Sequence, residues 1–145
     1  MGLVLESLCM PIEQQKIEIV ERKGKGHPDT ICDLIAEEIS NSLCKEYMKK
    51  FGRILHYNVD KSLLVAGTAE HRFGGGEITS PMLLVIGDRA TSKFGGKEID
   101  IDEIVNNSVK NFFKKNFRFI REENYKLQVE LKKGSAELTS IFKKK

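Results

Sequence analysis

The sequence has 145 residues, of which 40% are hydrophobic and 31% are charged, as expected for a folded domain with a substantial core. Its 24 basic and 21 acidic residues leave a formal net charge of +3, which is too balanced to indicate a nucleic-acid-binding protein. No apolar run reaches the roughly 18 residues that a membrane span needs. We therefore expect neither nucleic acid nor a membrane as a partner.

The cysteines give no sign of a disulfide framework. Cys9, Cys32 and Cys44 are odd in number and lack Cys-x-x-Cys spacing. Reduced thiols in the cytoplasm are the simplest interpretation, and a metal–thiolate site is not expected. Residues 1–10 are apolar but carry Glu6 and have no basic leading region, so they match a signal peptide poorly.

The first expected elements are a short strand and a long helix. Residues 15–21 alternate in polarity around Ile17 and Ile19, which indicates a strand. A helix is predicted over residues 28–50, because Pro28 suits the first helical position and Gly52 the position just past the end. Its apolar residues recur at three- and four-residue steps, namely Ile31, Leu34, Ile35, Ile39, Leu43, Tyr47 and Phe51. The helix should therefore pack through one face only.

Strand candidates follow this helix. Residues 54–59 and 63–69 are separated by Asp60-Lys61-Ser62, which has the composition of a turn. A second turn is expected at Gly74-Gly75-Gly76, before the next strand candidate at residues 82–86, and Gly95-Gly96 marks another turn. That last segment is apolar without alternation, which suggests a strand covered on both faces.

A second helix and a final strand complete the pattern. The helix is predicted over residues 101–117, with Asp100 as its cap and Glu103 three residues further on. Residues 125–131 alternate in polarity and indicate a strand with one exposed side. The order predicts an α+β fold, in which a mainly antiparallel sheet carries two long helices on one face. We expect residues 1–145 to form a single domain.

The loop before the first helix is the strongest functional candidate. A helix N-terminus offers unpaired N–H groups and the positive end of the helix dipole, which together favour phosphate. His27 adds a hydrogen-bond donor and Asp29 a hard oxygen ligand, so the loop suggests a phosphate chain carried with Mg²⁺. It is not a Walker A loop, because no Gly-Lys-Ser/Thr closes it. A solvated turn with a helix cap is the alternative interpretation of the same residues.

The same loop carries a family resemblance. Glu21-Arg22-Lys23-Gly24-Lys25-Gly26-His27-Pro28-Asp29-Thr30-Ile31-Cys32-Asp33 resembles the opening signature of the methionine adenosyltransferase (S-adenosylmethionine synthetase) family, in its archaeal branch. Further segments resemble the same branch in order: Pro11-Ile12-Glu13-Gln14-Gln15, Glu18-Ile19-Val20-Glu21-Arg22-Lys23-Gly24, Phe51-Gly52-x-Ile54-Leu55-His56-x-Asn58-x-Asp60-Lys61, Arg72-Phe73-Gly74-Gly75-Gly76, Gly87-x-Arg89-Ala90-Thr91 and Gly134-Ser135-Ala136-Glu137-Leu138. The resemblance covers almost the whole chain.

The resemblance implies a reaction and a set of site residues. In this family the methionine sulfur attacks the 5′ carbon of ATP and displaces the triphosphate, so it implies ATP and methionine as substrates and Mg²⁺ as cofactor. It implies His27 and Lys61 as catalytic residues that contact the triphosphate. The nucleotide-binding set that it implies is Glu21, Gly26, His27, Lys61 and Ser135. The metal ligands that it implies are Asp29, Asp60 and Glu137.

The chain departs from the family at several positions. Lys132-Lys133-Gly134 stands where the family has Gly-Gln-Gly, and Glu137 stands where it has an aspartate, which would move a metal ligand by one methylene. Asn58 stands near the position where bacterial relatives keep an acid for a monovalent cation, so the resemblance extends to K⁺ only weakly. Family members are also much longer and share their active site between two subunits.

Two main functional classes therefore stay open, with a basic nucleic-acid-binding domain as a third, weaker one. The first is the N-terminal part of a methionine adenosyltransferase, incomplete alone and joined in a homodimer or to a partner chain that supplies the missing domains. The second is a non-catalytic nucleotide- or phosphate-binding or assembly module derived from the same family. Each candidate residue also has a simpler interpretation: His27 as a helix cap, Asp29 as a partner of the helix dipole and Asp60-Lys61 as a surface turn.

Overall fold

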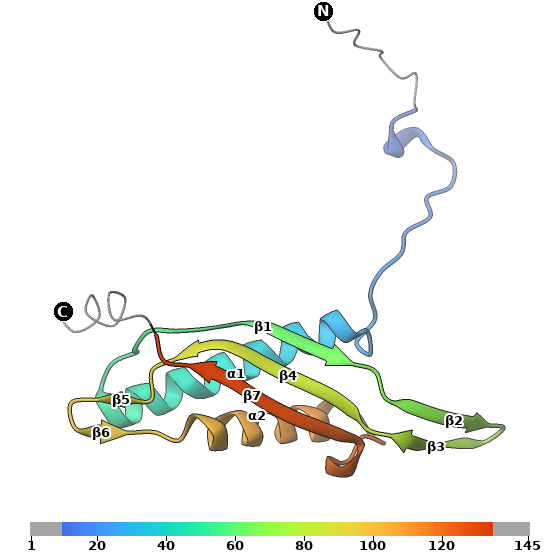
Figure 1. Cartoon of the computed structure of the whole chain (residues 1–145). Helices are drawn as coiled ribbons and strands as arrows, with labels where there is room; N and C mark the ends of the chain where they lie inside the picture. The colour runs from blue at the N-terminus through green and yellow to red at the C-terminus, as the bar shows by residue number, and fades with distance from the viewer. Residues whose placement is uncertain (1–9, 135–145) are drawn as a thin grey trace, which may run out of the picture.

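Two helices lie on one face of a three-stranded sheet in the computed structural model, which describes residues 10–134 (Figure 1). The strand order is β1-β4-β7, comprising β1 (Tyr57–Val65), β4 (Met82–Ala90) and β7 (Tyr125–Lys132). β1 pairs with β4 in antiparallel fashion, whereas β4 and β7 are parallel. The helices are α1 (Pro28–Phe51) and α2 (Ile101–Asn116). The predicted α+β class, with two helices on one face of the sheet, is confirmed.

Two hairpins and two short 3₁₀ turns complete the described chain. β2 (Thr68–Arg72) and β3 (Gly75–Ser80) form a hairpin that projects beyond the end of the sheet (Figure 1). β5 (Lys93–Phe94) and β6 (Lys97–Glu98) form a smaller one. The 3₁₀ turns are η1 (Ile12–Gln14) and η2 (Glu122–Asn124). Positive φ angles at Gly74, Gly95 and Gly96 confirm the expected glycine turns.

Local signals set both ends of α1. Pro28 occupies the first turn, and His27 before it has extended backbone angles and caps the helix. At the other end Gly52 adopts φ 70°, and its N–H donates to the carbonyl of Met48. The expected stripe is buried from Ile31 to Tyr47 except at Leu34, which is 42% exposed.

The core fills the space between the helices and the inner face of the sheet. α1 contributes Ile35, Ile39, Leu43 and Tyr47, all of which are fully buried. The Tyr47 hydroxyl donates to the Thr91 carbonyl at 2.8 Å. From α2, Phe113 stacks on Tyr125 of β7 with ring centroids 4.6 Å apart, and Asp100 caps the helix by accepting from the Glu103 N–H at 2.9 Å.

Two strand predictions were wrong. Residues 15–21 are not in a strand: they belong to an extended arm, residues 10–26, whose residues are all exposed, and Ile19 is 93% exposed. An alternating pattern forms a strand only beside a partner, and within residues 10–134 the arm has none (Figure 1). Likewise Asp60-Lys61-Ser62 is not a turn between two strands, because β1 continues through it with a register shift between Asn58 and Lys61.

The helices cover only one face of β4. Leu84 and Ile86 are fully buried beneath the helices, whereas Leu83 and Val85, which alternate with them, keep partial exposure on the opposite face. Among residues 10–134, β4 is therefore covered on one face, whereas the sequence pattern suggested a strand covered on both faces. No helix in this described range is both long and apolar enough to cross a lipid bilayer.

Candidate phosphate and nucleotide site

His27 caps the first turn of α1 with its side chain. The backbone N–H of Asp29 donates to His27 Nδ1 at 3.2 Å, and the N–H of His27 donates to the Gly24 carbonyl at 3.0 Å, which closes the preceding turn. Because Nδ1 accepts a hydrogen bond, the neutral imidazole carries its proton on Nε2. His27 therefore retains one ring donor while it caps the helix.

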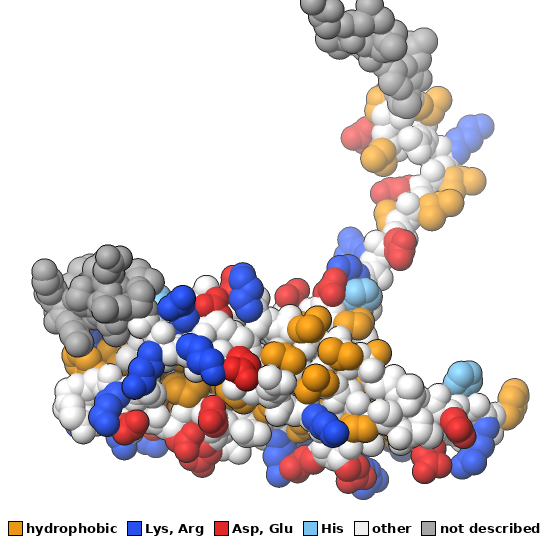
Figure 2. Space-filling view, in the orientation of Figure 1, with side chains coloured by type: hydrophobic (Ala, Val, Ile, Leu, Met, Phe, Trp, Pro, Cys, Tyr) orange, Lys and Arg blue, Asp and Glu red, His pale blue; other side chains and the backbone are white. Residues whose placement is uncertain are grey.

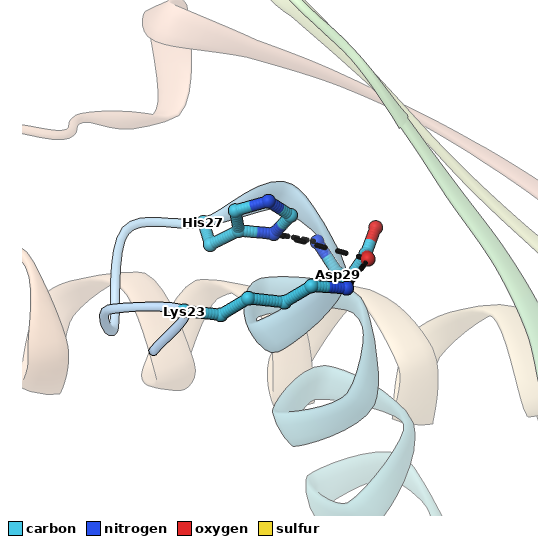
Figure 3. A network of polar contacts seen from close by, with 3 residues as sticks. All are labelled: Lys23, His27 and Asp29. Carbon is cyan, nitrogen blue, oxygen red and sulfur yellow. Dashed lines mark hydrogen bonds and ion pairs between the residues drawn. The ribbon is translucent and has the colours of Figure 1, made fainter. Parts of the chain in front are cut away.

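Lys23 and Asp29 form an ion pair across the same turn (Figure 3). Lys23 comes from the loop, and Asp29 is the second residue of α1, so the pair ties the loop to the helix start. The hydrogen bond and charge of Lys23 hold the pKa of Asp29 below its ordinary value. Both side chains are 59% exposed, so the pair contributes little to stability. Its main effect is to keep Asp29 ionised beside a lysine.

β1 brings a second carboxylate to the helix start. A hollow of about 170 Å³ between α1 and β1 is lined by Pro28 and Asp29 on one side and by Asp60 and Ser62 on the other. Asp29 and Asp60 are 31 residues apart in the sequence, yet the fold places them on the same hollow. Lys61 lines a neighbouring hollow of about 330 Å³, which it shares with Asp60.

Asp60 and Lys61 form their own ion pair. Lys61 Nζ donates to Asp60 Oδ2 at 2.8 Å, and both side chains are more than half exposed. This hydrogen bond is the main reason that the pKa of Asp60 lies below its ordinary value. Asp60 in turn raises the pKa of Lys61. The pair thus presents one fixed cation and one fixed carboxylate beside the hollows.

The sequence matches the S-adenosylmethionine synthetase (AdoMet synthetase) family over residues 3–145. The chain belongs to this family. It is 45% identical over 133 residues to the S-adenosylmethionine synthase of Methanothrix thermoacetophila, an alignment that covers 91% of this chain and 33% of the relative. It is 44% identical over 146 residues to the enzyme of the same name from Aeropyrum pernix, with 97% and 36% covered. The chain thus spans about a third of the length of these relatives.

The donor set of this family member suits Mg²⁺ that arrives with phosphate. Mg²⁺ is commonly held by one or two carboxylates together with water and substrate phosphates, and Asp29 and Asp60 supply two carboxylates on one hollow. Both carboxylates are already paired with lysines. Within residues 10–134 no group of three or more His, Cys, Asp or Glu side chains is placed to hold a metal ion alone. The residues therefore fit Mg²⁺ as a companion of a polyphosphate.

The other sequence candidates lie apart from that hollow or outside the described range. Glu21 is exposed on the arm. Gly26 is exposed in the loop, and a Cβ added there would meet nothing within 4 Å, so the folded chain itself does not require glycine at this position. Ser135 and Glu137 lie outside the described residues 10–134.

One polar residue of the site was missed by sequence reasoning. Asp88 lies in β4, where its carboxyl accepts from Asn58 Nδ2 at 2.9 Å and lies beside that of Asp60. The signal was an acid just beyond the apolar segment 82–86, within the Gly87-x-Arg89-Ala90-Thr91 motif. Its placement beside Asp60 depends on strand pairing, which the local pattern does not encode.

Proposed function

We propose that this chain is part of an enzyme that makes S-adenosylmethionine from ATP and methionine. The observation that supports it best is the hollow between α1 and β1. Asp29 at the capped start of α1 lines one side of it, and Asp60 of β1 lines the other. The family membership supplies the reaction class, a transfer of the adenosyl group to sulfur. Because the chain spans about a third of its relatives, the complete reaction also needs groups from another portion or partner.

The chemistry of this reaction centres on its leaving group. Triphosphate leaves with a large negative charge, so catalysis depends on fixed donors and cations more than on a nucleophilic side chain. In our proposal His27 donates through Nε2 to the triphosphate, and Lys61 contacts it as a fixed cation. Asp29 and Asp60 hold Mg²⁺, which when bound neutralises part of the phosphate charge. Glu21, Gly26 and Ser135 complete the nucleotide-binding set, with Glu137 as a third metal ligand.

Lys23 takes part in this arrangement by exchanging partners. It neutralises Asp29 in the present structure, where the carboxylate would otherwise repel an incoming polyphosphate. With Mg²⁺ on Asp29, Lys23 would be available to a phosphate oxygen. Asp29 would then face a cation with and without the ligand.

The outer face of the sheet supports a homodimer or a partner chain. Leu63 and Val65 of β1 are 60% and 46% exposed, and they pair in register with Val85 and Leu83 of β4. Figure 2 shows hydrophobic side chains gathered over this part of the two strands. An apolar patch of this kind favours a covering surface. We propose that a second copy, or the portion that completes the enzyme, covers it, and that the domain works in the cytoplasm, where its free thiols stay reduced.

The deciding experiment measures S-adenosylmethionine formation. The pure chain is incubated with ATP, methionine and Mg²⁺, alone and together with a separately produced protein that covers the remaining two thirds of a relative. We expect product only in the combined sample, and we expect the substitution His27→Ala to reduce it by about 100-fold. Absence of product from every combination would reject the enzymatic proposal.

A non-catalytic phosphate-binding module is the second candidate. The observation that favours it is that Asp29 and Asp60, the candidate metal ligands within residues 10–134, are both paired with lysines, which gives a site that can hold an anion without turnover. Calorimetric titration with tripolyphosphate separates the two functions when combined with the product assay. Binding without product in any combination would identify the module.

A further inference from the structure

Asp88 has an unusual backbone conformation for a residue inside a strand. Its φ is 99°, and within residues 10–134 it is the only residue other than glycine with a positive φ. L-amino acids rarely adopt this region, and they remain there only when surrounding contacts hold them. The contacts around Asp88 therefore maintain a conformation that the isolated strand would not choose.

The strained residue faces a β-bulge. Asn58 pairs with Arg89 and Lys61 pairs with Gly87, so Val59 and Asp60 of β1 together lie opposite Asp88 of β4. Two residues on one strand against one on its partner is the pattern of a bulge. The bulge breaks the in–out alternation of β1: Val59 is buried, and Asp60 and Lys61 that follow it are both exposed. Without the extra residue, Lys61 would point to the same face as Val59.

The side chain of Asp88 contacts both the residue before the bulge and the residue in it. Its Oδ2 accepts from Asn58 Nδ2 at 2.9 Å, and its carboxyl lies beside that of Asp60. Arg89 Nε lies 3.8 Å from Oδ1. The side chain is only 16% exposed, although it lies beside two exposed residues. It therefore joins the two strands at the irregular point.

We propose that Asp88 is a positioning residue that holds the β1 bulge and thereby aims Asp60 and Lys61 at the polyphosphate. This inference rests on the proposed function for its ligand, but the geometry of the bulge is independent of it. Asp88 itself contacts neither phosphate nor metal. It acts through the backbone of β1 and through the side chains of Asn58 and Asp60.

Two substitutions test whether Asp88 positions the bulge or is merely a strained residue that the fold tolerates. Asp88→Gly relieves the positive φ and removes the side-chain contacts. Asp88→Asn keeps both, because asparagine tolerates positive φ and its amide oxygen can still accept from Asn58. If the residue were only strained, the glycine variant would equal or exceed the parent in every property. If Asp88 positions the bulge, the glycine variant is stable but has a loose bulge, and the asparagine variant resembles the parent.

The experiment uses the 145-residue chain and two readouts. Backbone ¹⁵N order parameters at Asp60 and Lys61, measured without ligand, should fall from about 0.85 in the parent to about 0.6 in Asp88→Gly and stay near the parent value in Asp88→Asn. Affinity for tripolyphosphate with Mg²⁺, measured by calorimetry, should fall about tenfold in the glycine variant only. Asn58→Ala, which removes one contact without touching the strained residue, should loosen the bulge in the same direction.

Unchanged order parameters in both Asp88→Gly and Asn58→Ala would overturn the inference, as would a loose bulge that binds tripolyphosphate as tightly as the parent. If the parent chain does not bind tripolyphosphate, the polyphosphate site proposed for the chain alone fails, and the order parameters alone then decide the role of Asp88. A rigid bulge in the glycine variant rejects that role, and a loose bulge restored by asparagine supports it.

Discussion

The Nδ1 atom of His27 accepts a hydrogen bond from the backbone N–H of Asp29 at 3.2 Å. This contact joins two interpretations that the sequence left as alternatives, a helix cap and a phosphate ligand. A cap uses one ring nitrogen as acceptor, and a phosphate ligand needs the other as donor. The same imidazole can therefore serve both, provided that it is neutral with its proton on Nε2.

Substitutions at His27 should separate these two contributions. His27→Asn retains a side-chain oxygen that can cap α1, whereas His27→Ala removes the cap and should lower the free energy of unfolding by about 1 kcal/mol. Both variants lack the Nε2 donor, so both should bind tripolyphosphate more weakly than the parent. Urea unfolding and calorimetry measure the two effects. Parent-like tripolyphosphate binding by His27→Asn would show that the imidazole acts only as a cap.

The ion pair between Lys23 and Asp29 makes a prediction about pH. Because Lys23 holds the pKa of Asp29 below its ordinary value, the paired carboxylate adds stability above the pKa of the unfolded chain and loses it as the pH falls through the lower folded-state pKa. The effect on unfolding should be small because both groups are exposed. An NMR titration of the Asp29 carboxyl should give a higher pKa in Lys23→Gln than in the parent. Equal values would mean that the pair does not persist in solution.

Removal of Mg²⁺ should weaken polyphosphate binding. With Asp29 and Asp60 as ligands, tripolyphosphate should bind about tenfold more weakly in EDTA than with Mg²⁺, and Asp29→Asn should remove most of that difference. Glu123→Gln is a matched control, because Glu123 is exposed in η2, outside the α1–β1 hollow. Calorimetry with and without Mg²⁺ gives all values. Parent-like Mg²⁺ dependence in Asp29→Asn would remove this residue from the proposed ligand set.

The outer sheet face should mediate association. Leu63→Lys places a charge in the exposed apolar patch, so it should turn a dimer into a monomer while leaving the free energy of unfolding of the monomer within about 0.5 kcal/mol. Lys115→Glu, on the exposed side of α2 and thus away from the outer sheet face, serves as the surface control. Sedimentation velocity reports the mass of each variant. A parent chain that stays monomeric at high concentration would reject a homodimer of the chain alone.

The core offers a prediction that is independent of ligands. Tyr47→Phe removes the hydroxyl that donates to the Thr91 carbonyl and leaves that acceptor without this donor in a buried place, which should cost about 1–2 kcal/mol of unfolding free energy. Burial also raises the pKa of Tyr47, so the hydrogen bond should persist at alkaline pH. Chemical denaturation measures the loss, and tripolyphosphate affinity should not change. A loss of affinity would imply that the core and the site are coupled.

Features defined by neighbouring residues were predictable from the sequence. Pro28 and Gly52 fixed α1, Asp100 fixed the start of α2, and the glycine pair at residues 95 and 96 marked a turn. The groups that interact in each case lie within a few residues of one another, so a short stretch of sequence contains all of them. The same holds for the candidate loop, since its cap joins His27 to the next residue but one.

Features that depend on distant partners were not predictable. The alternation around Ile19 indicated a strand, but no strand is available to pair with it among residues 10–134. Asp60-Lys61-Ser62 has turn composition, yet it forms a bulge because Asp88 of another strand lies opposite. The parallel pairing of β4 with β7 likewise has no local signature. The hollow lined by Asp29 and Asp60 was not predictable for the same reason, because it forms only where β1 packs against α1.

The parallel run of β7 beside β4 has a consequence for the eroded segment at residues 132–134. β7 ends at Lys132, which pairs with Arg89, and Gly134 follows two residues later. A Cβ added at Gly134 would lie only 2.9 Å from His56 Nδ1. A larger residue at position 134 therefore fits only if the His56 ring moves aside. The side-chain size that this position accepts thus depends on the placement of His56, which is distant from it in the sequence.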